Sequence, residues 1–305
     1  MRRFLLTAFL GVFLFTHTLA QQQTESRVFP VSVIDEEGTP YSGLKPEHVA
    51  AWVDKEPLKV ISVKTENTPV DMGIVIDLSG SIGPPGKKES KEFRRKLNDA
   101  ITRFLAVSHP ENDYFATTFN ERVAISENWT GPNDSLFEKL DAPANKGQTA
   151  LYDALYFAIK NVTSGRHSRR VLLAITDGFD NESKRTFKEV AELIKRTDVI
   201  VYAIALYDKT KQGSSLAKEG LEVLDDLTEL SGGRAVFVNY SEKPEVVKTA
   251  FEIIAADLQA QYQLTIENAK AVGPEKWRKL KLKLNLPEEK GRPKLWIRSR
   301  AGYYQ

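Results

Sequence analysis

The sequence DLSGS at residues 77–81 follows the apolar run MGIVI at residues 72–76. A β-branched run that stops at an acid, two hydroxyls and a glycine is typical of a buried parallel strand that delivers polar side chains to its carboxyl edge. Open α/β sheets bind ligands at such edges. Asp77, Ser79 and Ser81 alternate along the loop, so their oxygens can turn toward one point while Leu78 turns toward the core. These residues supply half of a site for a hard cation.

Strands alternate with helices from residue 67 to about residue 260. Apolar runs typical of strands occur at 114–119, 171–175, 199–206 and 234–238, and segments with helical spacing of apolar residues lie between them. A further helix is predicted after the last strand, at 244–260. Repeated strand–helix units predict an α/β fold, with a parallel sheet covered by helices on both faces.

The two flanking segments, 21–66 and 261–305, alternate apolar and polar residues instead. Phe29, Val31 and Val33 share one face of a predicted strand. Leucines at 280, 282 and 284 alternate with lysines at 279, 281 and 283, and the simplest interpretation of the lysines is a solvated strand face. Neither segment holds enough strands to be stable alone. We therefore predict that both segments form one small β-sandwich into which the α/β domain, residues 67–260, is inserted.

The beginning of the chain resembles an export signal. Residues 1–20 contain Arg2 and Arg3, an apolar stretch and a small-residue end at Ala20, which are the zones of a signal peptide. We expect cleavage after Ala20, with a retained membrane anchor as the alternative, and no later segment is long enough to span a bilayer. The expected location is therefore periplasmic, cell-surface or extracellular.

The composition argues against a disulfide-stabilised fold and against a nucleic-acid-binding function. The chain has 305 residues, 41% of them hydrophobic, and no cysteine, so the fold depends on its core rather than on disulfides. The formal net charge of +2 falls to neutral when the two arginines of the signal segment are removed. A neutral mature chain argues against nucleic acid as a partner.

Two further junctions between strands and helices carry oxygen ligands. Thr149 stands at the start of a predicted helix, and Asp177 follows the strand at 171–175 and precedes Gly178. Hydroxyls are neutral ligands, so a divalent ion held by Ser79, Ser81 and Thr149, with the two carboxylates acting partly through water, keeps much of its positive charge. Such an ion would take a carboxylate from another protein as its last ligand. Octahedral oxygen coordination favours Mg²⁺ or Mn²⁺, and a looser site admits Ca²⁺.

The ordered set of Asp77, Ser79, Ser81, Thr149 and Asp177 resembles the metal-ion-dependent adhesion site of the von Willebrand factor A domain. That site reads Asp-x-Ser-x-Ser, then a distant Thr, then an Asp before Gly. The resemblance covers about residues 67–260, and residues 298–303 look like those of exported bacterial proteins related to this family. It implies a doubly wound, mainly parallel sheet with one antiparallel edge strand, expected at 123–125, and a protein partner that supplies an Asp or Glu carboxylate.

Each part of the set also has a simpler structural interpretation. Asp77-x-Ser-x-Ser and Thr149 could cap helices, and Asp177 could form a turn. Asp180 could support the metal ligands, although a helix cap is the simpler role. What favours a metal site is that all the parts lie in order at one predicted sheet edge.

The sequence favours a binding protein over an enzyme, because it lacks a recognisable catalytic arrangement. Histidines 48, 109 and 167 are scattered without ligand spacing, which argues against a zinc site or a histidine-based triad. No general base accompanies the predicted ion, so we assign no catalytic residue, and a hydrolase that uses the ion as a Lewis acid is the disfavoured alternative. A structural module of a cell-envelope assembly, with a stabilising or vestigial metal site, is the other alternative.

Overall fold

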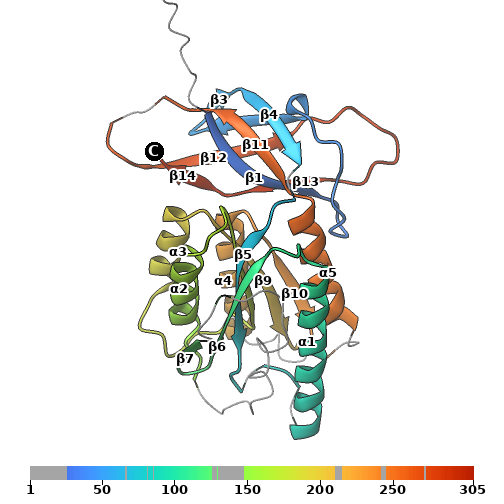
Figure 1. The fold of residues 1–305 in the computed structure, drawn as a ribbon, viewed down its shortest axis with the longest axis vertical. Helices are drawn as coiled ribbons and strands as arrows, with labels where there is room; N and C mark the ends of the chain where they lie inside the picture. The colour runs from blue at the N-terminus through green and yellow to red at the C-terminus, as the bar shows by residue number, and fades with distance from the viewer. Residues whose placement is uncertain are drawn as a thin grey trace, which may run out of the picture.

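The computed structural model describes residues 26–65, 67–80, 82–84, 86–125, 129, 148–209, 215–241, 245–270 and 273–305. The predicted signal segment and the predicted ligand Ser81 therefore lie outside the described residues. Figure 1 shows an α/β part with a smaller all-β part stacked against one end of it.

The α/β part is built on a six-stranded sheet with the order β10-β9-β8-β5-β6-β7. Its strands are β5 (Val70–Asp77), β6 (Asp113–Phe119), β7 (Val123–Ile125), β8 (Arg169–Thr176), β9 (Val199–Tyr207) and β10 (Ala235–Asn239). All neighbouring pairs are parallel except β6 and β7, which are antiparallel. The predicted edge strand at 123–125 is thus confirmed.

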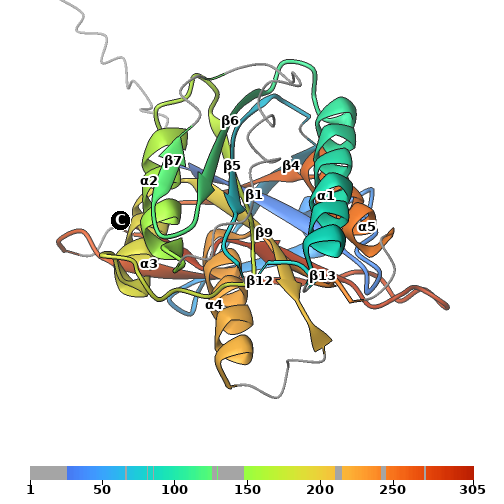
Figure 2. The ribbon, with the colours of Figure 1, turned by 90° about the horizontal axis from the view of Figure 1, so that it is seen from below.

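Helices cover both faces of this sheet, as the alternating pattern predicts (Figure 2). Helices α1 (Lys87–Val107) and α5 (Glu245–Gln259) pack on one face, in a core that includes Ile101 and Phe104. Helices α2 (Leu151–Val162), α3 (Phe187–Arg196) and α4 (Ser215–Ser231) pack on the other. Every residue of β5 is buried, because a central strand between two helical layers has no solvent-facing side. Helix α4 is longer than its apolar pattern at 221–230 suggests.

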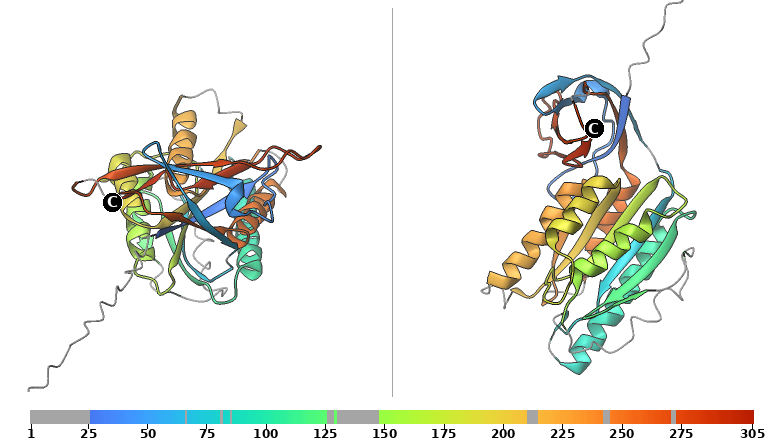
Figure 3. Two further views of the ribbon diagram at one scale, coloured as in Figure 1. Left: turned by 90° about the horizontal axis from the view of Figure 1, so that it is seen from above. Right: turned by 90° about the vertical axis from the view of Figure 1, so that its left-hand side faces the viewer.

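The first and last segments of the chain form two four-stranded sheets. The right-hand view of Figure 3 shows these blue and orange-to-red strands together at one end of the protein. One sheet joins β1 (Ser26–Ile34), β4 (Val60–Thr65), β11 (Tyr262–Glu267) and β13 (Trp296–Ser299). The other joins β2 (Val49–Val53), β3 (Glu56–Leu58), β12 (Trp277–Leu284) and β14 (Gly302–Tyr304). Phe29, Val31 and Val33 share a buried core with Leu264 and Tyr303 from the far end of the chain. The predicted pairing of the two ends is therefore present.

The α/β part meets the sandwich at the amino edge of its sheet, because β4 leads into β5 and α5 leads into β11. The carboxyl edge, where the parallel strands end, points away from the sandwich (Figure 1). In the described part of the chain, no helix combines the length and apolarity that a membrane crossing requires.

Candidate functional site

The carboxyl edge of the central sheet holds the four predicted ligands that the structure describes. Asp77 is the last residue of β5, and Asp177 follows the last residue of the neighbouring strand β8. Ser79 lies two residues beyond β5, and Thr149 precedes α2. Asp77, Ser79 and Thr149 are almost fully buried, at 2%, 1% and 3% exposure. Ser81 lies outside the described residues.

Hydrogen bonds on two sides connect Thr149 to this edge. The backbone N–H of Ala150 donates to the carbonyl of Asn120, just beyond β6, at 2.7 Å. On the other side, the N–H of Thr149 donates to Oδ1 of Asn181 at 2.7 Å, and the N–H of Asn181 returns a bond of 3.0 Å to the Thr149 carbonyl. Thr149 is thereby held between the ends of β6 and β8. Sequence reasoning missed this role of Asn181, for which no local pattern gives a signal.

Asp77 carries the strongest electrostatic perturbation at this edge. Its Oδ1 accepts the N–H of Ser79 at 2.8 Å, and its Oδ2 accepts the hydroxyl of Thr176 at 2.7 Å. Burial, and then the negative charge of Asp177, raise the pKa of Asp77 to about 7, against the lowering effect of these hydrogen bonds. The negative charge of Asp177 beside the buried Asp77 gives this edge a negative potential, which a cation would relieve.

The structure tests whether the predicted ligands cap the helices that follow them. Helix α1 begins at Lys87 after Gly86, so Asp77 and Ser79 do not cap it. The N-cap of α2 is Ala150, not Thr149. Asp77 and Asp177 do form turns, because each Oδ1 accepts the backbone N–H two residues on. A turn of this kind uses one carboxylate oxygen. The other oxygen of Asp77 accepts the Thr176 hydroxyl, and each carboxylate oxygen has a second lone pair that could face a cation.

Asp180 has the capping role that the simpler interpretation predicts, but for a helix that precedes it in the chain. Its Oδ1 accepts the N–H of Tyr152 in the first turn of α2 at 3.1 Å. The hydroxyl of Ser183 accepts the next N–H, from Asp153, at 3.0 Å. The loop after β8 thus satisfies the free N–H groups at the start of α2. It also fixes the beginning of α2 relative to Asp177.

Gly178 fixes the Asp177 loop against α4. It has a φ of +80°, and a Cβ atom there would lie 2.0 Å from the carbonyl oxygen of Gly220 in α4. Only glycine fits a left-handed backbone in such close contact with another backbone.

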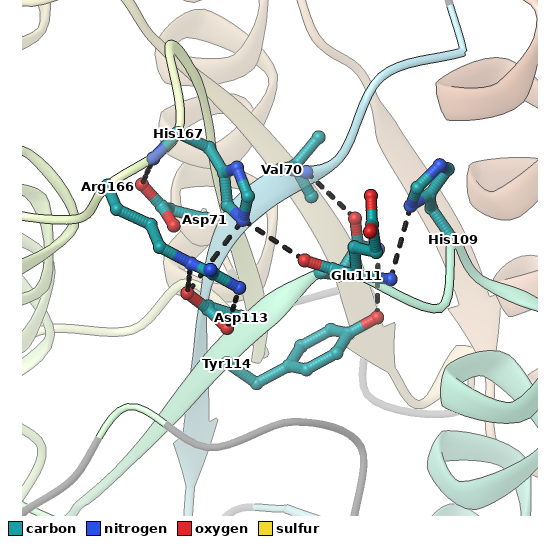
Figure 4. Close-up of polar contacts among 9 residues, drawn as sticks. Val70, Asp71, His109, Glu111, Asp113, Tyr114, Arg166 and His167 are labelled. Atoms are coloured by element: carbon teal, nitrogen blue, oxygen red, sulfur yellow. Dashed lines mark hydrogen bonds and ion pairs between the residues drawn. The ribbon is translucent and has the colours of Figure 1, made fainter.

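A second cluster of polar side chains lies at the opposite, amino edge of the sheet (Figure 4). Within the described residues, Asp71, Asp113 and His167 form a group whose ligand atoms, all within 4.8 Å of one another, could hold a metal ion. The N–H of His167 donates to Oδ2 of Asp71 at 2.6 Å. The sequence around His167 has no ligand spacing, because three separate segments of the chain build this group.

Arg166 already provides positive charge in this second cluster. Its Nε and Nη2 atoms bind the two carboxylate oxygens of Asp113 at 2.5 and 3.1 Å. His167 Nε2 lies 3.0 Å from the carbonyl oxygen of Glu111 and 3.8 Å from Asp113 Oδ2. A metal ion would have to compete with both contacts. We therefore interpret the cluster as an ion-paired clasp between β5, β6 and the turn before β8.

Comparison with known proteins agrees with the fold. The von Willebrand factor type A domain family matches residues 71–250, which is more than half of the chain. A search of curated proteins finds no match.

Solved structures of the same fold are distant in sequence. A variant of the PilB minor pilin from Streptococcus sanguinis is 13% identical, with a TM-score of 0.50, over 64% of this chain and 62% of that one. Proximal thread matrix protein 1 from the mussel byssus is 15% identical, with a TM-score of 0.50, over 68% and 50%. A von Willebrand factor type A protein from Catenulispora acidiphila is 11% identical, with a TM-score of 0.49, over 93% and 75%. From the family match and the architecture together, the chain belongs to the von Willebrand factor type A domain family.

Proposed function

We propose that this protein binds a partner protein through a divalent cation held at the carboxyl edge of its central sheet. The ligands in this proposal are Asp77, Ser79, Ser81, Thr149 and Asp177, and the preferred ion is Mg²⁺, with Mn²⁺ or Ca²⁺ as substitutes. Von Willebrand factor type A domains are generally interaction modules rather than enzymes, which supports a binding role.

The observation that carries the proposal is the pair formed by Asp77 and Asp177. Asp77 is buried, and the charge of Asp177 contributes to its raised pKa. Carboxylate and hydroxyl oxygens at the edge fit a hard divalent cation. Bound there, the ion would supply a positive centre with an open position for an acidic side chain.

The proposed partner offers an Asp or Glu carboxylate to that open position. The ligand set is rich in neutral hydroxyls, which leaves the ion attractive to an external anion. We further propose that the chain acts outside the cytoplasm, after export through residues 1–20. A structural module of a cell envelope is the alternative, in which the ion only stabilises the fold.

The test is a pull-down from envelope and extracellular extracts with the chain lacking residues 1–20. It is run with Mg²⁺, with Mn²⁺ and with a chelator, beside Asp77→Ala and the surface control Asp99→Ala. A partner that is retained only with metal and lost only in Asp77→Ala supports the proposal. Stabilisation by Mg²⁺ without any metal-dependent partner favours the structural alternative, and a partner that ignores both metal and the variant contradicts adhesion through the ion.

A further inference from the structure

A large groove separates the sandwich from two helices of the α/β part, at the end remote from the proposed metal site. Its volume is about 1350 Å³, and its walls are the outer face of β2 and β12 and the surfaces of α3 and α4. Apolar contact surface comes from Trp52 on the sandwich and from Phe187 and Leu230 on the helices.

The sandwich wall of this groove is basic. In the register of β12 with β2, Lys281 stands opposite Trp52 and Lys283 opposite Ala50. The alternate positions Leu280 and Leu282 turn inward and pack in or against the sandwich core. Lysines 55, 279, 281 and 283 are exposed and line the groove.

Other charged groups of the groove are largely engaged. Asp54 binds Arg278 and the backbone of Lys279, and Arg300 binds Asp198. On the facing wall, Asp226 and Glu229 of α4 are exposed. Within the described residues, no ion pair includes any of the four lysines. The sandwich wall therefore offers unpaired positive charge to an anionic partner.

The groove also borders an open strand edge. Strand β14 pairs with β12 only at Trp277–Lys279, and the last bond on this side joins the N–H of Leu280 to the carbonyl of Ala301. The chain before Ala301 belongs to β13, which pairs in the other sheet but passes close to β12. Peptide groups alternate in direction along a strand, so those of Leu282 and Leu284 face the same side as that of Leu280. In the described part of the chain no strand pairs with them there.

From these features we propose that an extended acidic segment of a partner protein docks in the groove and pairs with the open edge of β12 at Leu282–Leu284. Alternate carboxylates of the segment would meet Lys281 and Lys283, since side chains of neighbouring strands on one face lie side by side. An open strand edge with a charged side-chain pattern recognises a polypeptide, whereas a nucleic acid or polyphosphate cannot complete its peptide hydrogen bonds. This surface is separate from the carboxyl edge and gives the protein a second binding site.

The experiment uses a short fluorescein-labelled peptide of alternating Glu and Val residues, with fluorescence anisotropy as the readout. We expect saturable binding that weakens as salt is added. The double variant Lys281→Glu/Lys283→Glu should bind roughly tenfold more weakly or worse, because two attractions become repulsions. Lys64→Glu, an exposed control on β4 away from the groove, should bind as the unchanged protein does. Methylation of alternate peptide nitrogens on the pairing side should abolish binding.

Several outcomes would overturn the inference. One is equal binding of a peptide that alternates Lys and Val, and another is an affinity that the double charge reversal leaves unchanged. Absence of saturation up to about 1 mM peptide would also exclude a specific site. If the methylated peptide binds as well as its parent, strand pairing is wrong. Asp77→Ala should bind the peptide normally, so failure here and failure of the proposed metal site can be told apart.

Discussion

Replacing Asp77 with asparagine tests how much the ionisation of this buried acid lowers the free energy of unfolding. The pKa of Asp77 is raised from 3.8 to about 7 by burial and by Asp177. In the metal-free protein the unfolded chain therefore loses this proton at a lower pH than the folded chain does. Between about pH 4 and pH 7 the free energy of unfolding should fall as the pH rises, and it should level off above pH 7.

The size of this effect follows from the two pKa values. Each unit of pKa difference corresponds to about 1.4 kcal/mol, so full ionisation of Asp77 destabilises the metal-free fold by about 4 kcal/mol. Asp77→Asn removes the charge and keeps the side-chain shape. In chelator at pH 8, we expect the variant to be more stable than the unchanged protein by up to that amount, and to be nearly equal to it at pH 4.

Urea unfolding in chelator across this pH range measures the difference, with the exposed Glu36→Gln as the matched control. Added Mg²⁺ should stabilise the unchanged protein strongly at pH 8 and less at pH 6, since below pH 7 the ion must displace a proton. It should not stabilise Asp77→Asn. If the two proteins show the same pH dependence in chelator, the account of Asp77 as a buried, charge-coupled acid is refuted.

Three further predictions concern the loops around this edge. Thr149→Val should keep the fold but weaken Mg²⁺ binding roughly ten- to a hundredfold, as titration calorimetry would show; unchanged affinity would remove Thr149 from the ligand set. Gly178→Ala should lower the free energy of unfolding by more than about 2 kcal/mol, because its Cβ atom meets the Gly220 carbonyl at a positive φ; thermal melting checks this, and a change within error would contradict the described contact. Asp180→Ala should cost about 1 kcal/mol through the lost cap of α2, whereas Asp180→Asn, which keeps an acceptor, should cost less in the same urea assay; equal losses would argue against capping.

The sheet and its helices could be predicted because a strand that is buried on both faces has an unbroken run of apolar residues. Strand β5 appears as an unbroken apolar run, since neither of its faces meets water. The pairing of the chain ends followed from two incomplete alternating patterns. Strand β2 was harder to predict, because Val49–Val53 is short and two of its five residues are alanine.

The parts of the site that escaped prediction depend on contacts between distant segments. Asn181 and Asp180 hold Thr149 and α2 across about thirty positions of the chain, and no local spacing records such a bond. The clasp of Asp71, Asp113, Arg166 and His167 likewise exists only because parallel strands start side by side. Whether Asp77, Ser79, Ser81, Thr149 and Asp177 bind a metal ion stays a prediction.

The joining of the two chain ends in the sandwich has a consequence for the order of folding. Arg27 donates to the carbonyl of Tyr304, 277 positions away, and β1 lies between β11 and β13. During synthesis the apolar strand β1 is made before the α/β part, but both of its neighbours are made after it. Because the α/β part is built largely from neighbouring strand–helix units, it can fold before the strands that pair with β1 have been made. The sandwich can close only after β11 and β13 have been made, and loss of residues 262–305 would leave β1 without β11 and β13 and would leave β2 with β3 alone.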